Sequence, residues 1–331
     1  MNGLSGGMAG IINGFRPKVI TEMPVSLDAI AKEGRKLLFE KELRKADGKF
    51  HPSKLCSPCL KADVIERIIL KLIEEDSKEK HAGAVLDNPT LRAAYDVYGG
   101  PEEVLVAIRN ESFDYKSYRS MDAGTAIHEM EQQKYFGPSG KVLGFWKCSN
   151  CKTVVEEISH MPESPCQNEV SVRSKTKDFA SEIIRPCAKF GTWLYEEARG
   201  IDTEFDVSWK VDLIVEVPEG RIIVDDKTMN SERWGALEEP QPKDATQLQI
   251  YLWLLGAEHG ILRYINAGDH QKDPKHFYLA RDTKVERWVK NYIKTVRELV
   301  ASNRWEDIGG VCDKPTQVRA KRCPFSFLCF K

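Results

Sequence analysis

The chain has 331 residues, 41% of them hydrophobic, which is enough for one large α/β domain with appendages or for two domains. Its 49 basic and 50 acidic side chains give a formal net charge of −1, which excludes a uniformly basic surface for binding nucleic acid. No apolar run is long enough to span a membrane, so we expect no membrane partner. Local basic patches are possible at residues 35–49, 116–119, 173–177 and 314–322.

The first 120 residues are predicted to be largely helical. Residues 1–20 are glycine-rich and lack a targeting signal, so we expect a flexible end and a cytoplasmic location. Helical patterns follow at residues 26–46 and 61–77. We therefore expect a helical lobe over residues 21–120. Its cysteines are Cys56 and Cys59.

A helix is predicted in DAGTAIHEMEQQKYFG, within residues 121–140, where Asp122 can cap the start and Gly137 the end. A lone histidine on a helix is more often structural than a ligand, so His128 does not by itself predict a site. One polar face of this helix contains Gly124, His128, Glu131, Gln132 and Tyr135.

Residues 141–170 are expected to form an insertion that binds zinc. The chain has nine cysteines and no signal peptide, which favours metal binding over disulfides. The segment WKCSNCK has the spacing of a zinc knuckle, although the partner half is irregular, and we expect a Cys3His site. Its expected ligands are Cys148, Cys151, His160 and Cys166. Cys187 is expected to be a buried free thiol.

A β-hairpin is predicted from residues 211–216 and 221–227, within a core domain over residues 171–305. Apolar residues oppose apolar residues if Leu213 pairs with Val224.

This register has a consequence for the charged residues at the end of the hairpin. It places Asp212 directly across from Asp225, and Lys227 lies on the same face because side chains alternate along a strand. Asp226 points to the other face. Two converging carboxylates can bind Mg²⁺ or Mn²⁺, and a neighbouring lysine can stabilise an anionic oxygen. These groups could perform metal-assisted phosphodiester hydrolysis, although ordinary solvated charges are the alternative for such a short pattern.

Further elements follow the hairpin. A helix is predicted at residues 245–256, with Gln247 and Tyr251 one turn apart; alternatively, Asp244 and Gln247 form a capping box and Tyr251 is half-buried core. Strands are expected near residues 261–266 and 275–280, and a long helix from Asp282. This last helix is expected to bury Val285, Trp288, Val289, Tyr292, Val296 and Leu299.

Four of these segments, in this order, resemble the PD-(D/E)XK nuclease superfamily in its RecB-like branch. They are Gly124-x3-His128, then Asp212, then Asp225 and Lys227 in IIVDDKT, then Gln247-x3-Tyr251. This branch includes the AddB nuclease domain, CRISPR-adaptation nucleases with an iron-sulfur cluster, and phage exonucleases. The order of the four segments is far more specific than any one of them.

The resemblance implies an α/β fold with a restriction-endonuclease-like core, in which helices flank a mixed central sheet. It also implies that His128, Asp212 and Asp225 bind Mg²⁺ or Mn²⁺, that Lys227 assists catalysis, and that Gln247 and Tyr251 support the site. The appendages would be the helical lobe, the zinc-knuckle-like insertion and a C-terminal cysteine cluster.

The resemblance also implies a [4Fe-4S] cluster that holds the two ends of the chain together. Its expected ligands are Cys59, Cys312, Cys323 and Cys329, the last three in residues 306–331. Cys56 could replace Cys59, and zinc could replace the cluster.

The sequence therefore favours a metal-dependent DNA nuclease, with DNA ends or single strands as substrates for an exonuclease. The alternatives are a nucleic-acid-binding or assembly subunit with a vestigial nuclease fold, and a nuclease acting on RNA. Protein partners in recombination, repair or phage replication are expected from the resemblance, and a phage-encoded protein would act in the host cytoplasm.

Overall fold

The computed structural model describes residues 49–55, 59–78, 88–109, 115–176, 179–187, 192–269 and 271–330, all within the unit Ala46–Lys331. The expected flexible end at residues 1–20, the helix at 26–46 and Cys56 lie outside these residues. In the described part of the chain, no helix is both long and apolar enough to cross a membrane.

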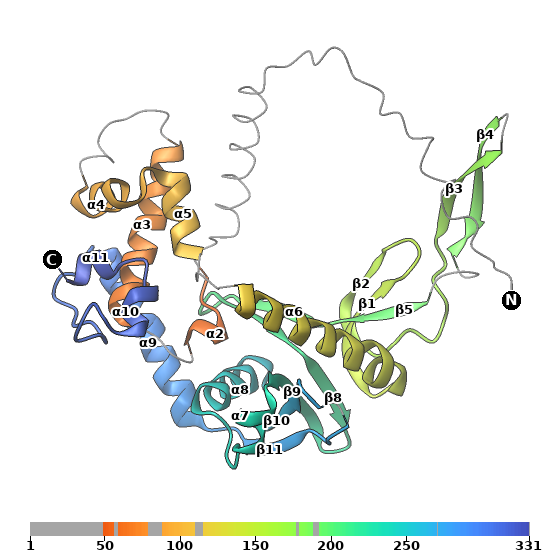
Figure 1. The fold of residues 1–331 in the computed structure, drawn as a ribbon. Helices are drawn as coiled ribbons and strands as arrows, with labels where there is room; N and C mark the ends of the chain where they lie inside the picture. Colours follow the sequence, from red (N-terminus) through yellow and green to blue (C-terminus); the bar gives the residue numbers. More distant parts are fainter. Residues whose placement is uncertain are drawn as a thin grey trace, which may run out of the picture. The chain divides into compact units, whose positions relative to one another are not determined.

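The centre of the fold is a seven-stranded mixed sheet with the order β11-β10-β9-β8-β1-β2, and with β5 paired to β1 (Figure 1). Only β9 and β10 are parallel; every other pair in this sheet is antiparallel. The strands are β1 (Val142–Cys148), β2 (Val154–Ser159), β5 (Trp193–Glu196), β8 (Leu213–Val217), β9 (Gly220–Met229), β10 (His259–Asn266) and β11 (Lys275–Ala280). The mixed sheet with flanking helices confirms the expected fold class.

The β8–β9 hairpin has the register predicted from its apolar pattern. Leu213 pairs with Val224, and Val217 pairs with Gly220 around a tight turn in which Gly220 has a φ of 130°. Both faces of the hairpin are buried rather than one. Leu213 and Val224 pack with Trp146 on one side of the sheet, whereas Ile214 and Ile223 pack with helix α8 on the other side. The strands therefore hold their register through two separate cores.

Two helices follow the predicted patterns closely. Helix α8 (Pro242–Leu255) begins at a proline, which suits the first turn, and ends at Gly256 in the left-handed conformation. Helix α9 (Thr283–Ala301) begins where Asp282 accepts a hydrogen bond from the amide of Lys284 at 2.8 Å. It buries Val289, Ile293 and Val296, but Trp288, expected in the core, is 44% exposed.

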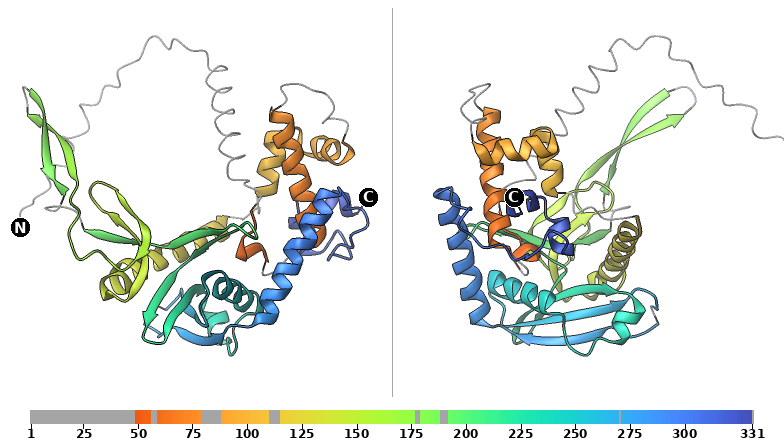
Figure 2. Two further views of the ribbon diagram at one scale, coloured as in Figure 1. Left: turned by 180° about the vertical axis from the view of Figure 1, so that it is seen from behind. Right: turned by 60° about the vertical axis from the view of Figure 1, so that its left-hand side comes forward.

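The N-terminal helices are α2 (Pro52–Leu55), α3 (Leu60–Lys78), α4 (Pro89–Tyr98) and α5 (Pro101–Arg109). Helix α3 packs against α9, so segments from opposite ends of the chain lie side by side (Figure 2). The Tyr292 hydroxyl donates to Asp63 at 2.5 Å, and the Tyr98 hydroxyl donates to the Pro324 carbonyl at 2.6 Å. The short C-terminal helices are α10 (Val318–Arg322) and α11 (Ser326–Cys329).

The helix expected to start at Asp122 is longer than predicted. Helix α6 (Tyr115–Met130) already includes Asp122, which therefore does not cap it. The helix continues through a π-helical turn (Glu131–Phe136) into a short 3₁₀ turn (Gly137–Ser139), and the left-handed residue is Gly140 rather than Gly137. The capping prediction was wrong because the helical conformation extends in both directions beyond the polar segment.

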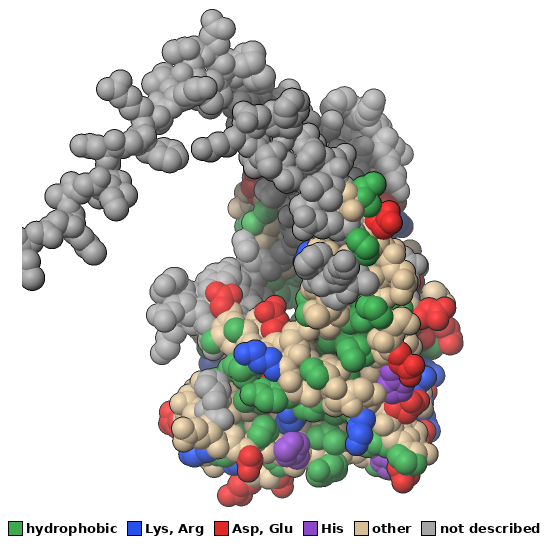
Figure 3. Space-filling model, turned by 90° about the vertical axis from the view of Figure 1, so that its right-hand side faces the viewer, with side chains coloured by type: hydrophobic (Ala, Val, Ile, Leu, Met, Phe, Trp, Pro, Cys, Tyr) green, Lys and Arg blue, Asp and Glu red, His purple; other side chains and the backbone are tan. Residues whose placement is uncertain are grey.

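The expected insertion begins with a strand of the central sheet, because β1 pairs with β8. Two hairpins lie outside that sheet: β3 (Glu169–Thr176) with β4 (Phe179–Pro186), and β6 (Ala198–Asp202) with β7 (Val207–Val211). Acidic and basic side chains are interspersed over the face in Figure 3, in agreement with the near-zero net charge.

Candidate active site

Asp212 lies at the bend between β7 and β8, where the chain passes from the small hairpin into the central sheet. Its Oδ2 accepts a hydrogen bond from the backbone amide of Asp226 at 2.7 Å. Its own carbonyl accepts hydrogen bonds from the Tyr195 hydroxyl at 3.0 Å and from Gln132 Nε2 at 3.4 Å. Both the side chain and the backbone of Asp212 are thereby fixed at the end of the hairpin.

Asp225 and Lys227 lie two residues apart on β9, on one face of the sheet. Lys227 Nζ is 2.6 Å from Asp225 Oδ2, and Asp225 is only 3% exposed. This contact is an ion pair in which the buried Oδ2 of Asp225 lies against the ammonium group of Lys227. One positive charge therefore lies beside the two carboxylates Asp212 and Asp225.

A chain of polar contacts joins Lys227 to helix α8. Lys227 Nζ donates to Gln247 Oε1 at 3.3 Å, and Gln247 Nε2 donates to the Tyr251 hydroxyl at 2.9 Å. Asp244 does not form the alternative capping box with Gln247; it accepts a hydrogen bond from the Tyr264 hydroxyl at 2.8 Å. Gln247 of α8 thus contacts Lys227 of β9, and Tyr251 contacts Gln247.

Helix α6 brings His128 to the same place. A Cβ atom at Gly124 would lie 2.8 Å from Thr228 Oγ1, so glycine permits the helix to approach β9 closely. His128 Nδ1 is 3.8 Å from Asp212 Oδ1. Burial lowers the pKa of His128, which favours the neutral imidazole that metal ions bind.

A second group of charges lies on the opposite face of β9 and was not identified from the sequence. Asp226 is buried and accepts hydrogen bonds from Arg263 Nε at 2.8 Å and Nη2 at 2.6 Å. Arg263 Nη1 also lies 3.0 Å from Glu131. The available signal was an arginine inside the apolar strand segment ILRYIN. The Arg263 guanidinium pairs with the Asp226 carboxylate. Asp226 is therefore not part of the carboxylate pair formed by Asp212 and Asp225.

The pKa values of Asp212 and Asp225 are raised to about 7, chiefly by burial. The neighbouring carboxylates, Asp226 for Asp212 and Asp212 for Asp225, contribute to this rise, and Lys227 opposes it. Burial alone would lower the pKa of Lys227, but the attraction of Asp225 outweighs it and raises that pKa. Lys227 therefore keeps its positive charge. This single charge is too little to neutralise both carboxylates.

This donor set fits a hard divalent cation. It offers carboxylate oxygens and, because burial lowers the pKa of His128, a neutral imidazole. The ligand atoms of His128, Asp212 and Asp225 are not all within 4.8 Å of one another, so these three described residues do not form a closed set around one point.

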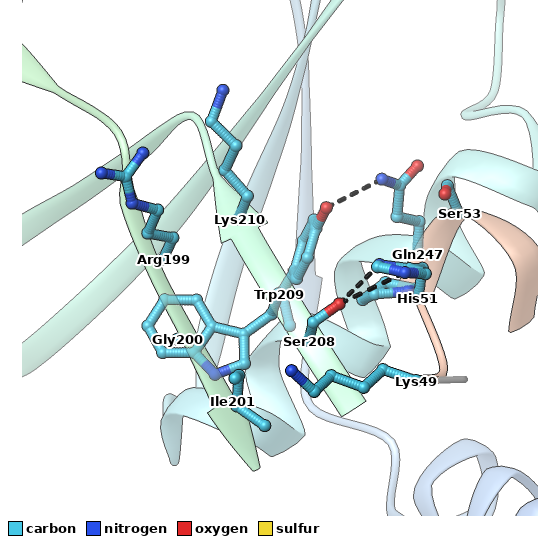
Figure 4. Close-up of a pocket in the computed structure, with 12 residues that line it drawn as sticks. Lys49, His51, Ser53, Arg199, Gly200, Ile201, Ser208, Trp209, Lys210 and Gln247 are labelled. Carbon is cyan, nitrogen blue, oxygen red and sulfur yellow. Dashed lines mark hydrogen bonds between the residues drawn. The ribbon is translucent and has the colours of Figure 1, made fainter. Parts of the chain in front are cut away.

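A groove of about 640 Å³ adjoins the site through Gln247 and Tyr251 (Figure 4). The ring of Trp209 lies against Gly200, where a Cβ atom would be 2.5 Å from Trp209 Cζ2. The Ser208 hydroxyl is 2.5 Å from His51 Nδ1. The remaining lining residues include the basic side chains Lys49, Arg199 and Lys210.

The structure corrects the expected zinc ligands. Cys148, Cys151, Cys166 and Cys187 place their four sulfur atoms within 4.8 Å of one another. His160 is not part of this group: its Nε2 lies 2.7 Å from Glu216 Oε2. Cys187 is not isolated, because its Sγ is 3.2 Å from that of Cys148. The sequence did not identify Cys187 as a member of this group because Cys187 follows a second hairpin, whose return to the knuckle has no signature in the sequence.

The cysteines near the two ends of the described chain influence one another electrostatically. The pKa of Cys323 is raised to about 11, chiefly by burial and also by the thiols of Cys59, Cys329 and Cys312, although an amide hydrogen bond from Phe325 opposes the shift. These four are the residues that the resemblance implies as cluster ligands. Their sulfur atoms do not form a group as tight as that of the other four cysteines.

A family model and a solved structure are similar to this chain. The family model described as the PD-(D/E)XK nuclease superfamily matches residues 103–330. A structure described as "Crystal structure of SSO0001" has 14% sequence identity and a TM-score of 0.30, over 89% of this chain and 95% of that chain. No curated protein matches the chain.

Without a divalent cation, ionisation of Asp212 and Asp225 should destabilise the fold. Their pKa of about 7 is above the ordinary 3.8 of an unfolded chain, so their contribution is complete below about pH 4 and is lost as the pH rises to about 7. We expect the melting temperature of Asp225→Asn, relative to wild type, to increase by a few degrees from pH 5.5 to pH 8 in buffers free of Mg²⁺ and Mn²⁺.

The control is Asp273→Asn, which changes an exposed carboxylate and should follow the wild-type protein at both pH values. A relative melting temperature of Asp225→Asn that is constant or falls over this range would contradict the assigned burial cost.

Proposed function

Because the chain belongs to the PD-(D/E)XK nuclease superfamily, whose members use divalent metals, we propose that it is a Mg²⁺- or Mn²⁺-dependent DNA nuclease. The observation that carries this proposal is the neighbouring pair Asp212 and Asp225, whose pKa values are raised to about 7 and which have a single lysine beside them. We propose exonuclease action on DNA ends or single strands.

His128, Asp212 and Asp225 would hold the ion. When bound, it supplies positive charge that neutralises a phosphate and acidifies water. The ion pair with Lys227 holds the Asp225 carboxylate, while the amide of Asp226 holds the Asp212 carboxylate in a fixed direction. Such fixed charges act without reorganisation during the reaction.

Lys227 acts as a charge-stabilising group rather than as a general base. Its pKa is raised by Asp225, so it does not give up its proton near neutral pH. Its ammonium group can therefore stabilise an anionic phosphate oxygen. Gln247 orients it, since the amide oxygen accepts from Nζ while the amide nitrogen is engaged with Tyr251.

The groove beside the site supports a single-stranded substrate. It combines basic side chains, which attract phosphates, with the indole ring of Trp209, on which a base can stack. Single-stranded nucleic acids bind to such combinations largely without sequence preference. We propose that a DNA strand follows this groove to Lys227.

We also propose membership of the RecB-like branch, with a [4Fe-4S] cluster on Cys59, Cys312, Cys323 and Cys329. The other thiols of this group raise the pKa values of Cys323 and Cys329, which supports one cluster bound by all four cysteines. Each thiolate of such a cluster binds a different iron, so the sulfur atoms are expected to stand farther apart than around one ion. The cluster would join α3 to the C-terminal helices.

Incubation of the purified protein with end-labelled DNA and Mn²⁺ tests the nuclease proposal. We expect cleavage by wild type, and a loss of at least about 100-fold in Asp225→Asn and Lys227→Ala, since removal of one charge-stabilising group costs this much in other enzymes. Glu219→Gln, in the exposed turn of the same hairpin, is the matched control and should retain activity.

Parallel assays with blocked DNA termini and with RNA test the mode and the substrate. Cleavage of DNA only when an end is free is the expected result. Activity that survives in both active-site variants would refute the assigned site, and cleavage of RNA alone would refute the DNA assignment.

Removal of the proposed stacking surface should weaken substrate binding. Loss of one base–aromatic contact costs about 1–3 kcal/mol, so we expect the KM of Trp209→Ala for single-stranded DNA to rise roughly tenfold, with kcat nearly unchanged. Trp209→Phe should restore most of the affinity. The control Trp288→Ala removes an exposed tryptophan on α9 and should not change the KM. An equal KM for Trp209→Ala and wild type would show that the DNA strand does not bind in this groove.

Purification without oxygen tests the iron-sulfur proposal. We expect a brown protein whose iron is lost in Cys323→Ser and Cys329→Ser, because each variant removes one of four ligands. A colourless protein that contains only zinc would overturn the iron assignment and leave the nuclease proposal intact.

A further inference from the structure

The four cysteines of the knuckle region come from three separate parts of the chain. Cys148 ends β1 and Cys151 lies in the turn before β2, whereas Cys166 precedes β3 and Cys187 follows β4. Their Sγ atoms approach pairwise to 3.2 Å between Cys148 and Cys187 and 3.5 Å between Cys151 and Cys166. Both distances are far longer than the roughly 2.05 Å of a disulfide bond.

The spacing of the sulfur atoms suits one tetrahedral ion. Four thiolates at about 2.3 Å from a common Zn²⁺ stand roughly 3.8 Å apart, and all four sulfur atoms here lie within 4.8 Å of one another. The sulfur ligands of a cluster with several iron atoms would have to lie farther apart. The sulfur atoms therefore form a closed set of four ligands with no position for a substrate, which is the arrangement of a structural zinc site.

Backbone and side-chain donors surround these sulfur atoms. The amides of Asn150 and Cys151 donate to Cys148 Sγ, and the amide of Asn168 donates to Cys166 Sγ. Asn168 Nδ2 also donates to Thr153 at 2.7 Å and to Cys151 Sγ at 3.7 Å. Hydrogen-bond donors next to the ligands of a metal site stabilise the thiolates and fix their orientation.

The position of the four cysteines in the fold indicates which elements a bound ion would hold together. Cys166 and Cys187 bracket the hairpin β3–β4, which pairs with no other strand of the described chain and extends away from β1, β2 and β5 (Figures 1 and 2). A two-stranded hairpin is marginally stable by itself. The amide of Cys187 donates to the Asn168 carbonyl at 2.7 Å, so both ends of the hairpin meet at the cysteines.

We propose that Cys148, Cys151, Cys166 and Cys187 bind one Zn²⁺ ion that fastens the base of the β3–β4 hairpin to strand β1 of the central sheet. Binding converts four thiols to thiolates and releases their protons to solvent. The ion is structural, and the site is independent of the active-site carboxylates. It is also independent of the proposed nuclease function.

Zinc content of purified variants tests this assignment. Cys187→Ser should lose one zinc per chain relative to wild type, whereas His160→Ala, which removes the histidine paired with Glu216, should lose none. Loss of zinc in His160→Ala but not in Cys187→Ser would overturn the proposal, as would wild-type protein whose zinc is retained in both variants.

Two measurements that do not require Cys187→Ser to fold complete the test. Zinc X-ray absorption of Cys323→Ser, in which the terminal thiol group is incomplete, should show four sulfur neighbours at about 2.3 Å; a nitrogen neighbour would refute the four-cysteine set. Chelation of zinc from the wild-type chain should increase hydrogen exchange in residues 169–186 but not in β8 and β9. Unchanged exchange in residues 169–186 would refute the fastening role.

Discussion

Two neighbouring carboxylates, one buried and one partly buried, share a single lysine, and this arrangement is the constraint on which the structure depends. Asp212 and Asp225 would repel each other at neutral pH, and one ammonium group neutralises only one of them. Such an arrangement destabilises a fold unless a cation is bound, so the surrounding structure must hold it in place. The two cores on either side of the β8–β9 hairpin provide that support.

The third acidic residue of the hairpin shows how the charges are separated. Asp226 is directed to the opposite face, where Arg263 satisfies its carboxylate, while its backbone amide holds Asp212. One residue thus joins a structural ion pair to the candidate metal site. A shift of the β9 register by one residue would place Asp226 opposite Asp212 and turn Asp225 to the other face, so the register of the apolar residues also determines the chemistry.

The sequence predicted the hairpin register because strand periodicity operates over short distances, and the pairing of Leu213 with Val224 follows from it. The position of Gln247 beside Lys227 was implied only by the resemblance. Partners from distant strands could not be predicted. Arg263 and Cys187 reach their positions through the order of strands and through the return of a hairpin, which no local pattern encodes. His160 was misassigned for the same reason.

Crystals of the protein grown with Mn²⁺ and measured at the manganese absorption edge would test the central claim most directly. The proposed site predicts an anomalous peak among His128, Asp212 and Asp225, and no such peak in Asp212→Asn. A well-ordered wild-type structure in which manganese binds elsewhere, or in which these side chains hold none, would contradict it.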